Sequence, residues 1–296
     1  MRVVGSLSTI PSRITGIEKT LVSLSNQSYK LDAVYLNVPY TSQREDTEYQ
    51  IPSVLTNYCH IVRGQDYGPI TKIIGALLQE DDPETIIITF DDDKVYPEGL
   101  VDKLLSKHRS NPETAIGSAG FKIGTFPFYM STVHNEHEHN KKWYTFDVAS
   151  DGEAVDVLRG APGVLYVRKF FPDLDHLDKL LRHSIENSVM FRNDDIVISG
   201  LLSQRGIERR VYKMPHVEES GNDSNGLSDS CSEYFFSLIK ALYHARKEGM
   251  FKNQVDYCRS KTMTCPIIMV LVVIVLFSVF SICKCRTNLL SKIPLT

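Results

Sequence analysis

The chain has 296 residues, of which 42% are hydrophobic, and its formal net charge is −3. This length allows one large domain or two small ones with a sizeable core, and the charge excludes the global basic field that recruits nucleic acid. We therefore expect no nucleic-acid partner. Only Cys59 of the six cysteines precedes residue 230, so the main part of the chain has no internal disulfide framework, which suits a reducing compartment.

Apolar runs of strand length alternate with segments of helical spacing through the first 120 residues. This alternation predicts an α/β fold, with a doubly wound sheet flanked by helices. The sequence has neither a Walker A motif nor GxGxxG, which disfavours a P-loop or a dinucleotide-binding fold. The predicted strands are Val3–Leu7, Ala33–Val38, Cys59–Val62, Ile86–Phe90 and Ala115–Gly120; the predicted helices contain Ile17–Leu24, Ile70–Leu78 and Leu100–Leu105, and Thr41–Glu48 is predicted as a loop.

The segment Thr85–Val95 (TIIITFDDDKV) carries the strongest chemical signal. Its apolar part has the pattern of a strand buried on both faces, and this strand ends in Asp91, Asp92 and Asp93. Adjacent carboxylates repel one another unless a divalent cation lies between them, and Mg²⁺ and Mn²⁺ take oxygen ligands. Because open α/β sheets bind ligands at the carboxyl ends of their strands, we expect a metal and phosphate site here. A solvated acidic turn is the alternative.

The pattern loosens after Phe121. Residues 126–144 are rich in aromatic residues and histidine, and we interpret them as a loop over a substrate cleft. A histidine tract of this kind can also bind zinc, although composition alone is weak support for such a site. The histidines of the zinc alternative are His134, His137 and His139.

A second acidic pair, Asp194 and Asp195, directly precedes the helix-like run Ile196–Leu202. One carboxylate there is explained by favourable contact with a helix N-terminus. Two in succession are better explained by a chemical role. The elements predicted between residue 150 and this pair are the strands Val155–Leu158 and Gly163–Val167 and a helix over Leu174–Ile185.

The C-terminal part contains a polar loop, Val217–Ser230, an amphipathic helix, Ser232–Lys247, and the uncharged run PIIMVLVVIVLFSVFSIC. That run is about as long as the shortest bilayer-spanning helix, roughly 17–25 residues, and the N-terminus lacks the apolar segment of a signal peptide. We expect a single-pass C-terminal anchor with a cytosolic catalytic domain. The predicted divisions are a main domain (1–230), a helix and connector (231–264), a transmembrane helix (265–283) and a short basic tail (284–296).

Four segments in this order resemble glycosyltransferases of the GT-A type, and the resemblance covers roughly residues 1–230. They are STIPSR (8–13), DYGPITK (66–72), the strand-end DDD and NDDIVIS (193–199). The chain is especially similar to the small glycosyltransferase-like domains of large algal DNA viruses. The resemblance implies a GT-A, Rossmann-like, mixed and mainly parallel sheet. It also implies a nucleotide-sugar donor, Mn²⁺ or Mg²⁺ as cofactor, and a glycan or glycoprotein acceptor.

The resemblance also implies roles for single residues. The leaving group of such a reaction is a nucleoside diphosphate, whose developing charge a divalent cation stabilises. An inverting transferase also needs a general base for the acceptor hydroxyl. The implied base is Asp195, with Asp194 second; the implied donor contacts are Thr9, Arg13, Asp66, Tyr67, Lys72, Asp91 and Asp92; and the implied metal ligands are Asp93, Asp91 and, as a minority choice, His216. The chain departs from the resembled family at one position. The residue before Gly160 tends to be acidic in that family, whereas here it is Arg159. This difference implies a different acceptor or a reduced activity.

Two other functions fit parts of the pattern. A haloacid-dehalogenase-like phosphatase has an apolar strand followed by DxDx[TV], which would make Asp91 the nucleophile and Asp93 the acid and base. Its metal ligands would then be Asp194 and Asp195. That motif normally follows the first strand of its domain, whereas several strand-and-helix units precede it here. The other alternative is a non-catalytic, membrane-anchored sugar-binding protein that has kept the fold.

Overall fold

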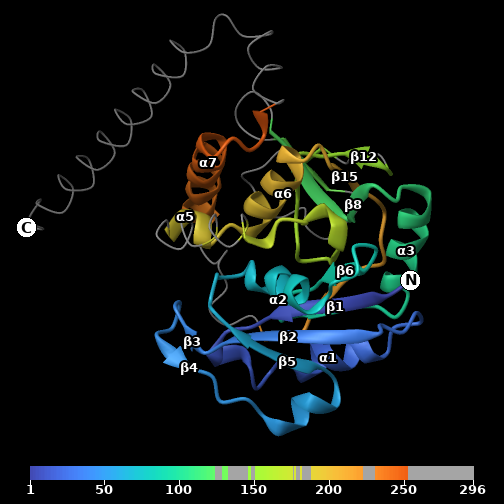
Figure 1. Cartoon of the computed structure of the whole chain (residues 1–296), viewed down its shortest axis with the longest axis vertical. Coiled ribbons are helices and arrows are strands. Elements are labelled where there is room, and N and C mark those ends of the chain that lie inside the picture. The colour runs from blue at the N-terminus through green and yellow to red at the C-terminus, as the bar shows by residue number, and fades with distance from the viewer. Residues whose placement is uncertain are drawn as a thin grey trace, which may run out of the picture. The chain divides into compact units, whose positions relative to one another are not determined.

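Strands and helices alternate along the first half of the chain, and most lie where the sequence predicts them (Figure 1). The computed structural model describes residues 1–123, 129–132, 146–147, 151–175, 177, 181, 188–222 and 231–252. The α-helices in these ranges include α1 (Glu18–Ser25), α2 (Thr71–Gln79), α3 (Leu100–Ser110), α5 (Ser188–Phe191), α6 (Asp194–Gln204) and α7 (Cys231–Lys247), and short 3-10 helices span Pro11–Arg13, Ser53–Asn57 and Arg168–Phe170.

The central sheet has eight strands in the described residues, in the order β12-β15-β8-β14-β6-β1-β2-β5. Strands β6, β1, β2 and β5 are parallel, and so are β15 and β8, whereas β14 and β12 are antiparallel to their neighbours. The fold is therefore α/β with a mixed, mainly parallel, Rossmann-like sheet flanked by helices, as predicted. The strands are β1 (Val3–Ser8), β2 (Ala33–Pro39), β5 (His60–Gly64), β6 (Ile86–Thr89), β8 (Thr114–Gly117), β12 (Glu153–Ala154), β14 (Val164–Val167) and β15 (Glu208–Val211).

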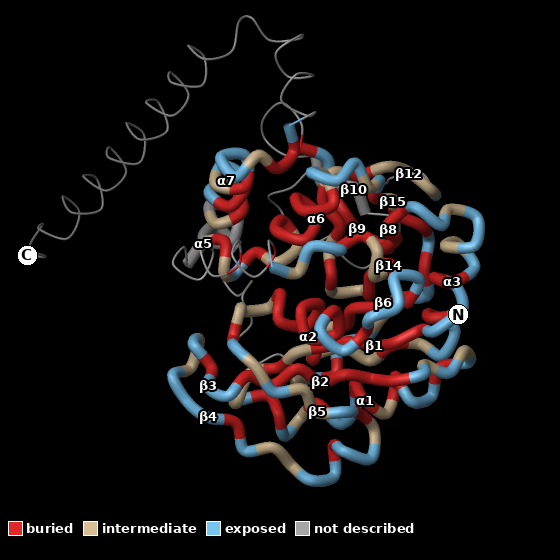
Figure 2. The backbone as a smooth tube through the Cα atoms, viewed as in Figure 1, coloured by how far each residue is buried: buried red, intermediate tan, exposed pale blue. Residues whose placement is uncertain are grey.

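Strand β6 is buried on both faces, which explains its unbroken apolar run. Ile87 packs in one buried cluster, together with residues of α2 and α6, whereas Ile86 and Ile88 pack in the other, together with residues of α1 and α3. A strand covered on both faces takes apolar side chains at every position. Figure 2 shows the same distribution, with buried residues concentrated in the strands and in the sides of the helices that face them.

Several predicted boundaries differ from the structure. Ala115–Gly120 is not one strand: the chain leaves the central sheet after β8 and continues as β9 in a second sheet, β11-β10-β9-β13. The three predicted loops, Thr41–Glu48, 126–144 and Val217–Ser230, each contain at least one short strand. Strand β15 was not predicted, because its charged residues hide the apolar alternation of a strand. The remaining strands are β3 (Thr41–Ser42), β4 (Thr47–Glu48), β7 (Lys94–Val95), β9 (Ala119–Lys122), β10 (Tyr129–Thr132), β11 (Phe146–Asp147), β13 (Val157–Leu158) and β16 (Glu218–Glu219).

The C-terminal predictions are tested only in part. Helix α7 is confirmed, and the described residues belong to a compact unit that ends at Lys252. No helix within that unit's described stretches is long and apolar enough to cross a membrane. The connector after Lys252, the predicted membrane helix 265–283, the basic tail, most of the predicted helix 174–185 and the residues His134, His137 and His139 lie outside the described residues.

Candidate functional site

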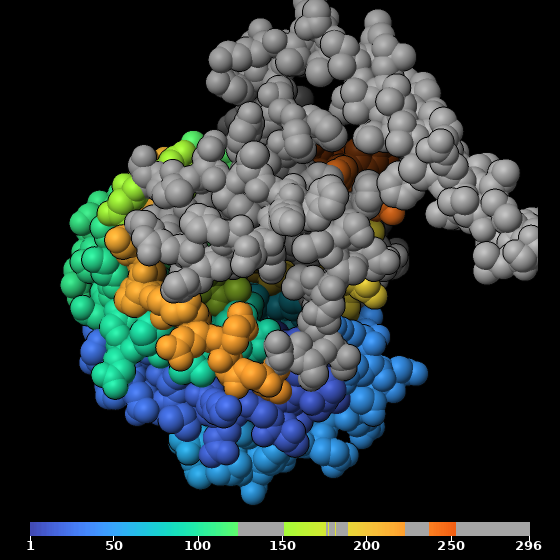
Figure 3. Space-filling view, turned by 180° about the vertical axis from the view of Figure 1, so that it is seen from behind, coloured from blue at the N-terminus to red at the C-terminus, as the bar shows by residue number. Residues whose placement is uncertain are grey.

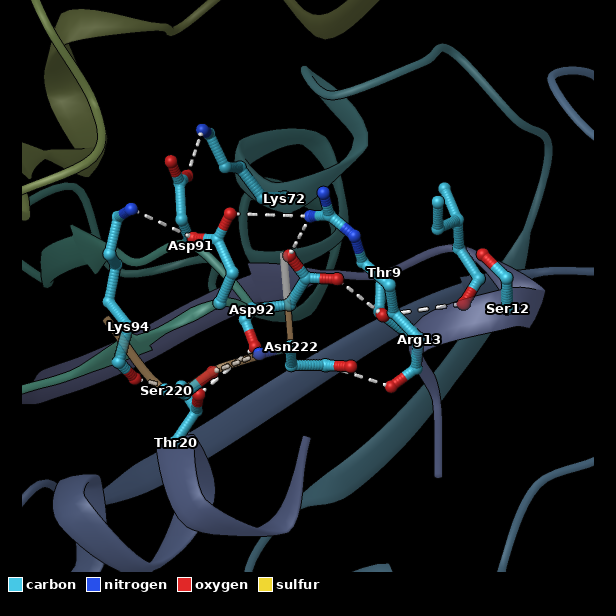
Figure 4. A network of polar contacts seen from close by, with 12 residues as sticks. Thr9, Ser12, Arg13, Thr20, Lys72, Asp91, Asp92, Lys94, Ser220 and Asn222 are labelled. Carbon is cyan, nitrogen blue, oxygen red and sulfur yellow. Dashed lines mark hydrogen bonds and ion pairs between the residues drawn. The ribbon is translucent and has the colours of Figure 1, made fainter. Parts of the chain in front are cut away.

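The parallel pairing of β1 with β6 brings two of the predicted segments to one edge of the sheet. The register sets Ser6 opposite Thr89, so the chain after β1 and the acidic triplet after β6 leave the sheet together. Helix α2 packs against both strands. Figure 4 shows the resulting network, in which Thr9 and Arg13 lie beside Asp92, and Lys72 lies beside Asp91.

The middle carboxylate of the triplet points inward. The Thr9 hydroxyl donates to Asp92 Oδ2 at 2.6 Å, and the Arg13 guanidinium donates to Asp92 Oδ1 at 2.9 Å. The hydroxyl of Thr20, on α1, bonds the backbone carbonyls of Asp92 and Lys94 at 3.0 and 2.7 Å. Burial raises the pKa of Asp92 to about 6, against the opposing effect of Arg13 and Thr9. These contacts hold the loop in place. Thr9, Arg13 and Asp92, all predicted to contact the donor, therefore form one hydrogen-bonded group in the structure.

The outer two carboxylates remain partly exposed. The side chains of Asp91 and Asp93 are 30% and 18% exposed, compared with 8% for Asp92. Because Asp92 is held inward by Thr9 and Arg13, these two flanking residues are the members of the triplet left to meet a ligand. The triplet thus divides into one structural residue and two candidate ligand-binding residues.

Lys72 joins the triplet to the second acidic pair. Its ammonium group lies 2.8 Å from Asp91 Oδ1 and 2.8 Å from Asp194 Oδ2, at the N-terminus of α6. Burial alone would lower the pKa of Lys72, but the neighbouring carboxylates, Asp194 first, raise it well above its ordinary value. Burial alone would raise the pKa of Asp91, but the positive charge of Lys72 and its hydrogen bond hold that pKa below its ordinary value. One buried cation therefore links two acidic groups that are far apart in sequence.

The backbone beneath Lys72 is fixed by buried polar side chains. Its carbonyl accepts hydrogen bonds from the Ser6 hydroxyl on β1 and from Asn37 Nδ2 on β2, the latter at 3.3 Å. Helix α2 can approach Asn37 only because position 75 is glycine, since a Cβ there would collide with Asn37 Oδ1. Side chains of β1 and β2 thus fix the backbone position of Lys72.

Asp195 differs from its neighbour in its surroundings. Its Oδ1 accepts the N–H of Gly160 at 2.9 Å, and a Cβ at Gly160 would lie 3.0 Å from that oxygen and 3.1 Å from Lys72 Nζ. Burial, and then the charge of Asp194, raise the pKa of Asp195 above its ordinary value, while Lys72 opposes the rise. A carboxylate whose pKa is shifted toward neutrality is suited to take up a proton.

Tyr96 is a site residue that sequence reasoning missed. Its hydroxyl accepts the backbone N–H of Asp91 at 2.7 Å and donates to the carbonyl of Ala161 at 3.1 Å. The ring packs edge-on against Phe90, with 4.7 Å between the centroids. Tyr96 therefore ties the triplet to the loop that carries Gly160, and no sequence signal distinguishes it from an ordinary core tyrosine.

The outer carboxylates fit a divalent cation. Asp93 Oδ1 is buried without a hydrogen-bond donor, and the Lys94 ammonium lies 3.4 Å from it. Across the described ranges, no group of three or more histidine, cysteine or acidic side chains forms a ready-made metal site. A Mg²⁺ ion is usually held by one or two carboxylates together with substrate phosphates and water. Asp91 and Asp93 would be the protein ligands.

The pairing of β16 with β7 does not place His216 beside Asp93. Strand β16 pairs with β7 so that Glu219 lies opposite Lys94, and the N–H of Ser220 donates to the carbonyl of Asp93 at 2.8 Å. Ser220 therefore lies beside Asp93, and His216 precedes β16 at the other end of this pairing. A metal role for His216 stays a prediction.

Asp66 has a structural role in the described geometry. Its Oδ1 accepts the N–H of Gly68 at 2.7 Å, and its Oδ2 accepts the N–H of Gln43 at 2.8 Å. It therefore ties the turn before α2 to the hairpin of β3 and β4. Tyr67, in the same turn, is partly exposed, and its backbone N–H donates to the Thr71 hydroxyl at 3.0 Å. Whether either residue touches a nucleotide stays a prediction.

No protein-family model matches the chain, and no curated protein matches it.

Proposed function

We propose that the chain is a metal-dependent glycosyltransferase that moves a sugar from a nucleoside-diphosphate donor to an acceptor hydroxyl. The observation that carries this proposal is the division of the acidic triplet. Asp92 is held inward by Thr9 and Arg13, while Asp91 and Asp93 stay partly exposed and Asp93 Oδ1 is buried without a hydrogen-bond donor. A turn of solvated acids needs neither feature.

Within this proposal, the residues divide the work as follows. Asp93 and Asp91 would hold Mn²⁺ or Mg²⁺, which stabilises the charge that develops on a departing diphosphate. Lys72, which lies beside Asp91, supplies a second positive charge on the same side of the site. Asp195, held by the Gly160 N–H and already raised in pKa, takes the proton from the acceptor hydroxyl. Inversion of configuration belongs to the same proposal, because an inverting transferase needs a general base for the acceptor hydroxyl and Asp195 is assigned that role.

The anchoring of the domain is part of the same proposal. The uncharged run in residues 265–283 supports a C-terminal membrane helix, with the catalytic domain on the cytosolic side. Acceptors would then be glycans or glycoproteins that reach the membrane surface.

The separate roles of the triplet give the first test. Asp93→Asn should weaken Mn²⁺ binding in the presence of a nucleoside diphosphate by at least about tenfold, because it removes one of two anionic ligands. Calorimetric titration of Mn²⁺ into the protein measures this.

The matched control for that test is Asp92→Asn. This change affects a carboxylate turned toward Thr9 and Arg13. It should therefore lower the melting temperature and reduce Mn²⁺ affinity less than Asp93→Asn does. Equal Mn²⁺ affinities for wild type and Asp93→Asn would contradict the assignment of Asp93.

A further inference from the structure

The residues that follow β15 return to the acidic triplet from a distant part of the sequence. Within residues Glu218–Asn222, here called the strap, Glu218 and Glu219 pair with β7 directly after the triplet. In Figure 3 the strap belongs to the orange surface that borders the blue N-terminal residues. The sequence of this stretch predicts only a polar loop.

The strap contacts the triplet through its backbone. The N–H of Ser220 donates to the Asp93 carbonyl at 2.8 Å, and the Lys94 ammonium lies 2.5 Å from Glu219 Oε2. On the other side, Lys19, on α1, donates to the Ser220 carbonyl at 3.1 Å. Ser220 is therefore held between α1 and the candidate metal ligand Asp93.

Asn222 forms the second attachment. Its Nδ2 donates to the backbone carbonyl of Arg13 at 2.9 Å, and Arg13 in turn pairs with Asp92 at 2.9 Å and Asp93 at 3.4 Å. The Asn222 amide lies against Gly16, where a Cβ would collide with its Oδ1. Position 16 therefore has to lack a side chain for Asn222 to reach Arg13.

Gly221 allows both attachments to form together. Its φ is +80°, a backbone conformation that costs glycine little and strains other residues. No atom lies within 4 Å of a Cβ built at this position, so the requirement for glycine comes from the backbone alone. This turn lets the Ser220 N–H face Asp93 while the Asn222 side chain faces Arg13.

We infer that the strap is a positioning device for the metal and diphosphate site, with Asn222 and its seat at Gly16 as the positioning residues. It fixes the backbones of Asp93 and Arg13, and through them the direction in which the outer carboxylate points. The inference rests on the proposed function in one respect, the nature of the ligand. A strap of this kind should affect affinity for the metal and the donor rather than the chemical step.

The test compares Asn222→Ala, Gly16→Ala and the double variant in the full-length protein. Asn222→Ala should weaken Mn²⁺ binding in the presence of a nucleoside diphosphate by about three- to tenfold, the usual range for one hydrogen bond. It should raise the donor KM by a similar factor with little change in kcat. Gly16→Ala should do the same by displacing Asn222. The double variant should match Asn222→Ala, because the added methyl group no longer meets an amide.

Asn111→Ala is the matched control. It removes an asparagine that also donates from Nδ2 to a backbone carbonyl, that of Lys107 at 3.1 Å, at the end of α3. It should leave Mn²⁺ affinity unchanged. An equal loss in Asn111→Ala, or wild-type affinity in Asn222→Ala, would overturn the inference, and so would a double variant whose effect is the sum of the two single effects.

Amide hydrogen exchange separates failure of this inference from failure of the proposed function. In Asn222→Ala, exchange should accelerate at Asp92–Val95 and stay unchanged in β2, whatever the ligand. If wild type binds no Mn²⁺, the proposed function fails, and the exchange result alone decides the inference: unchanged exchange at the triplet overturns it, and local acceleration supports it.

Discussion

Replacing Lys72 by methionine is expected to lower the free energy of unfolding by about 3 kcal/mol at neutral pH. The substitution leaves Asp91 and Asp194, both 2.8 Å from the ammonium group, without their shared partner. Removing one member of a buried ion pair typically costs about 3–5 kcal/mol, because a charge stays behind uncompensated. We expect the lower end of this range because the Asp91 side chain is 30% exposed. Urea unfolding of the full-length protein measures the change.

The deficit of Lys72→Met should shrink as the pH falls. In wild type the pKa of Asp91 lies below its ordinary value, so its ionised form contributes stability that is present above the ordinary pKa and is lost as pH falls through the lowered one. The variant lacks this contribution, so the two proteins should differ most near neutrality and least at acidic pH. A deficit that is constant with pH would show that Lys72 acts through packing alone.

Lys107→Met is the matched control for this change. Lys107 lies on a helix and pairs with Asp151 at 3.0 Å, but Asp151 is 51% exposed. Exposed pairs contribute about 0–1 kcal/mol. A loss in the control equal to that of Lys72→Met would contradict the importance of the buried bridge.

Asp195→Asn is expected to lower kcat by about 10²–10⁴-fold, the usual contribution of a general base. The asparagine can still accept the Gly160 N–H through its own Oδ1, so donor affinity and the melting temperature should change little. Steady-state rates with saturating donor and acceptor measure the effect. Asp194→Asn should cost less, because Asp194 acts through Lys72 rather than on the acceptor.

The pH dependence of the rate tests the assignment of Asp195 as the base. Burial and the charge of Asp194 raise the pKa of Asp195 to about 7, and a base works only when ionised. The wild-type rate should therefore rise with pH through neutrality and level off above it. That limb should be missing from the residual activity of Asp195→Asn. The same limb in both proteins, or a larger loss in Asp194→Asn, would assign the base elsewhere.

The parts of the structure that could be predicted are those encoded by local patterns. The unbroken apolar run Ile86–Thr89 predicts a strand buried on both faces. The position of Asp91–Asp93 at the carboxyl end of that strand predicts a ligand site at the edge of the sheet. The inward turn of Asp92 could not be predicted. It depends on Thr9 and Arg13, which reach the triplet only when β1 pairs with β6.

Contacts between distant segments account for most of what sequence analysis missed. Lys72 bridges the triplet to α6, Tyr96 connects Asp91 to Ala161, and β16 pairs with β7 although over a hundred residues separate them. None of these residues is unusual in its local sequence. Strand β15 was missed for a different reason, since its segment ERRV is mostly charged and lacks the apolar alternation of a strand.

The central claim is tested most directly by following the release of nucleoside diphosphate from a panel of nucleotide sugars, with and without Mn²⁺. We predict that the full-length protein releases the diphosphate from one donor, that release requires the metal, and that Asp93→Asn abolishes it. Release of phosphate from phosphorylated sugars, with every nucleotide sugar left intact, would contradict the account and favour the phosphatase. Tight donor binding with no turnover in the presence of acceptor glycans would instead identify a sugar-binding protein.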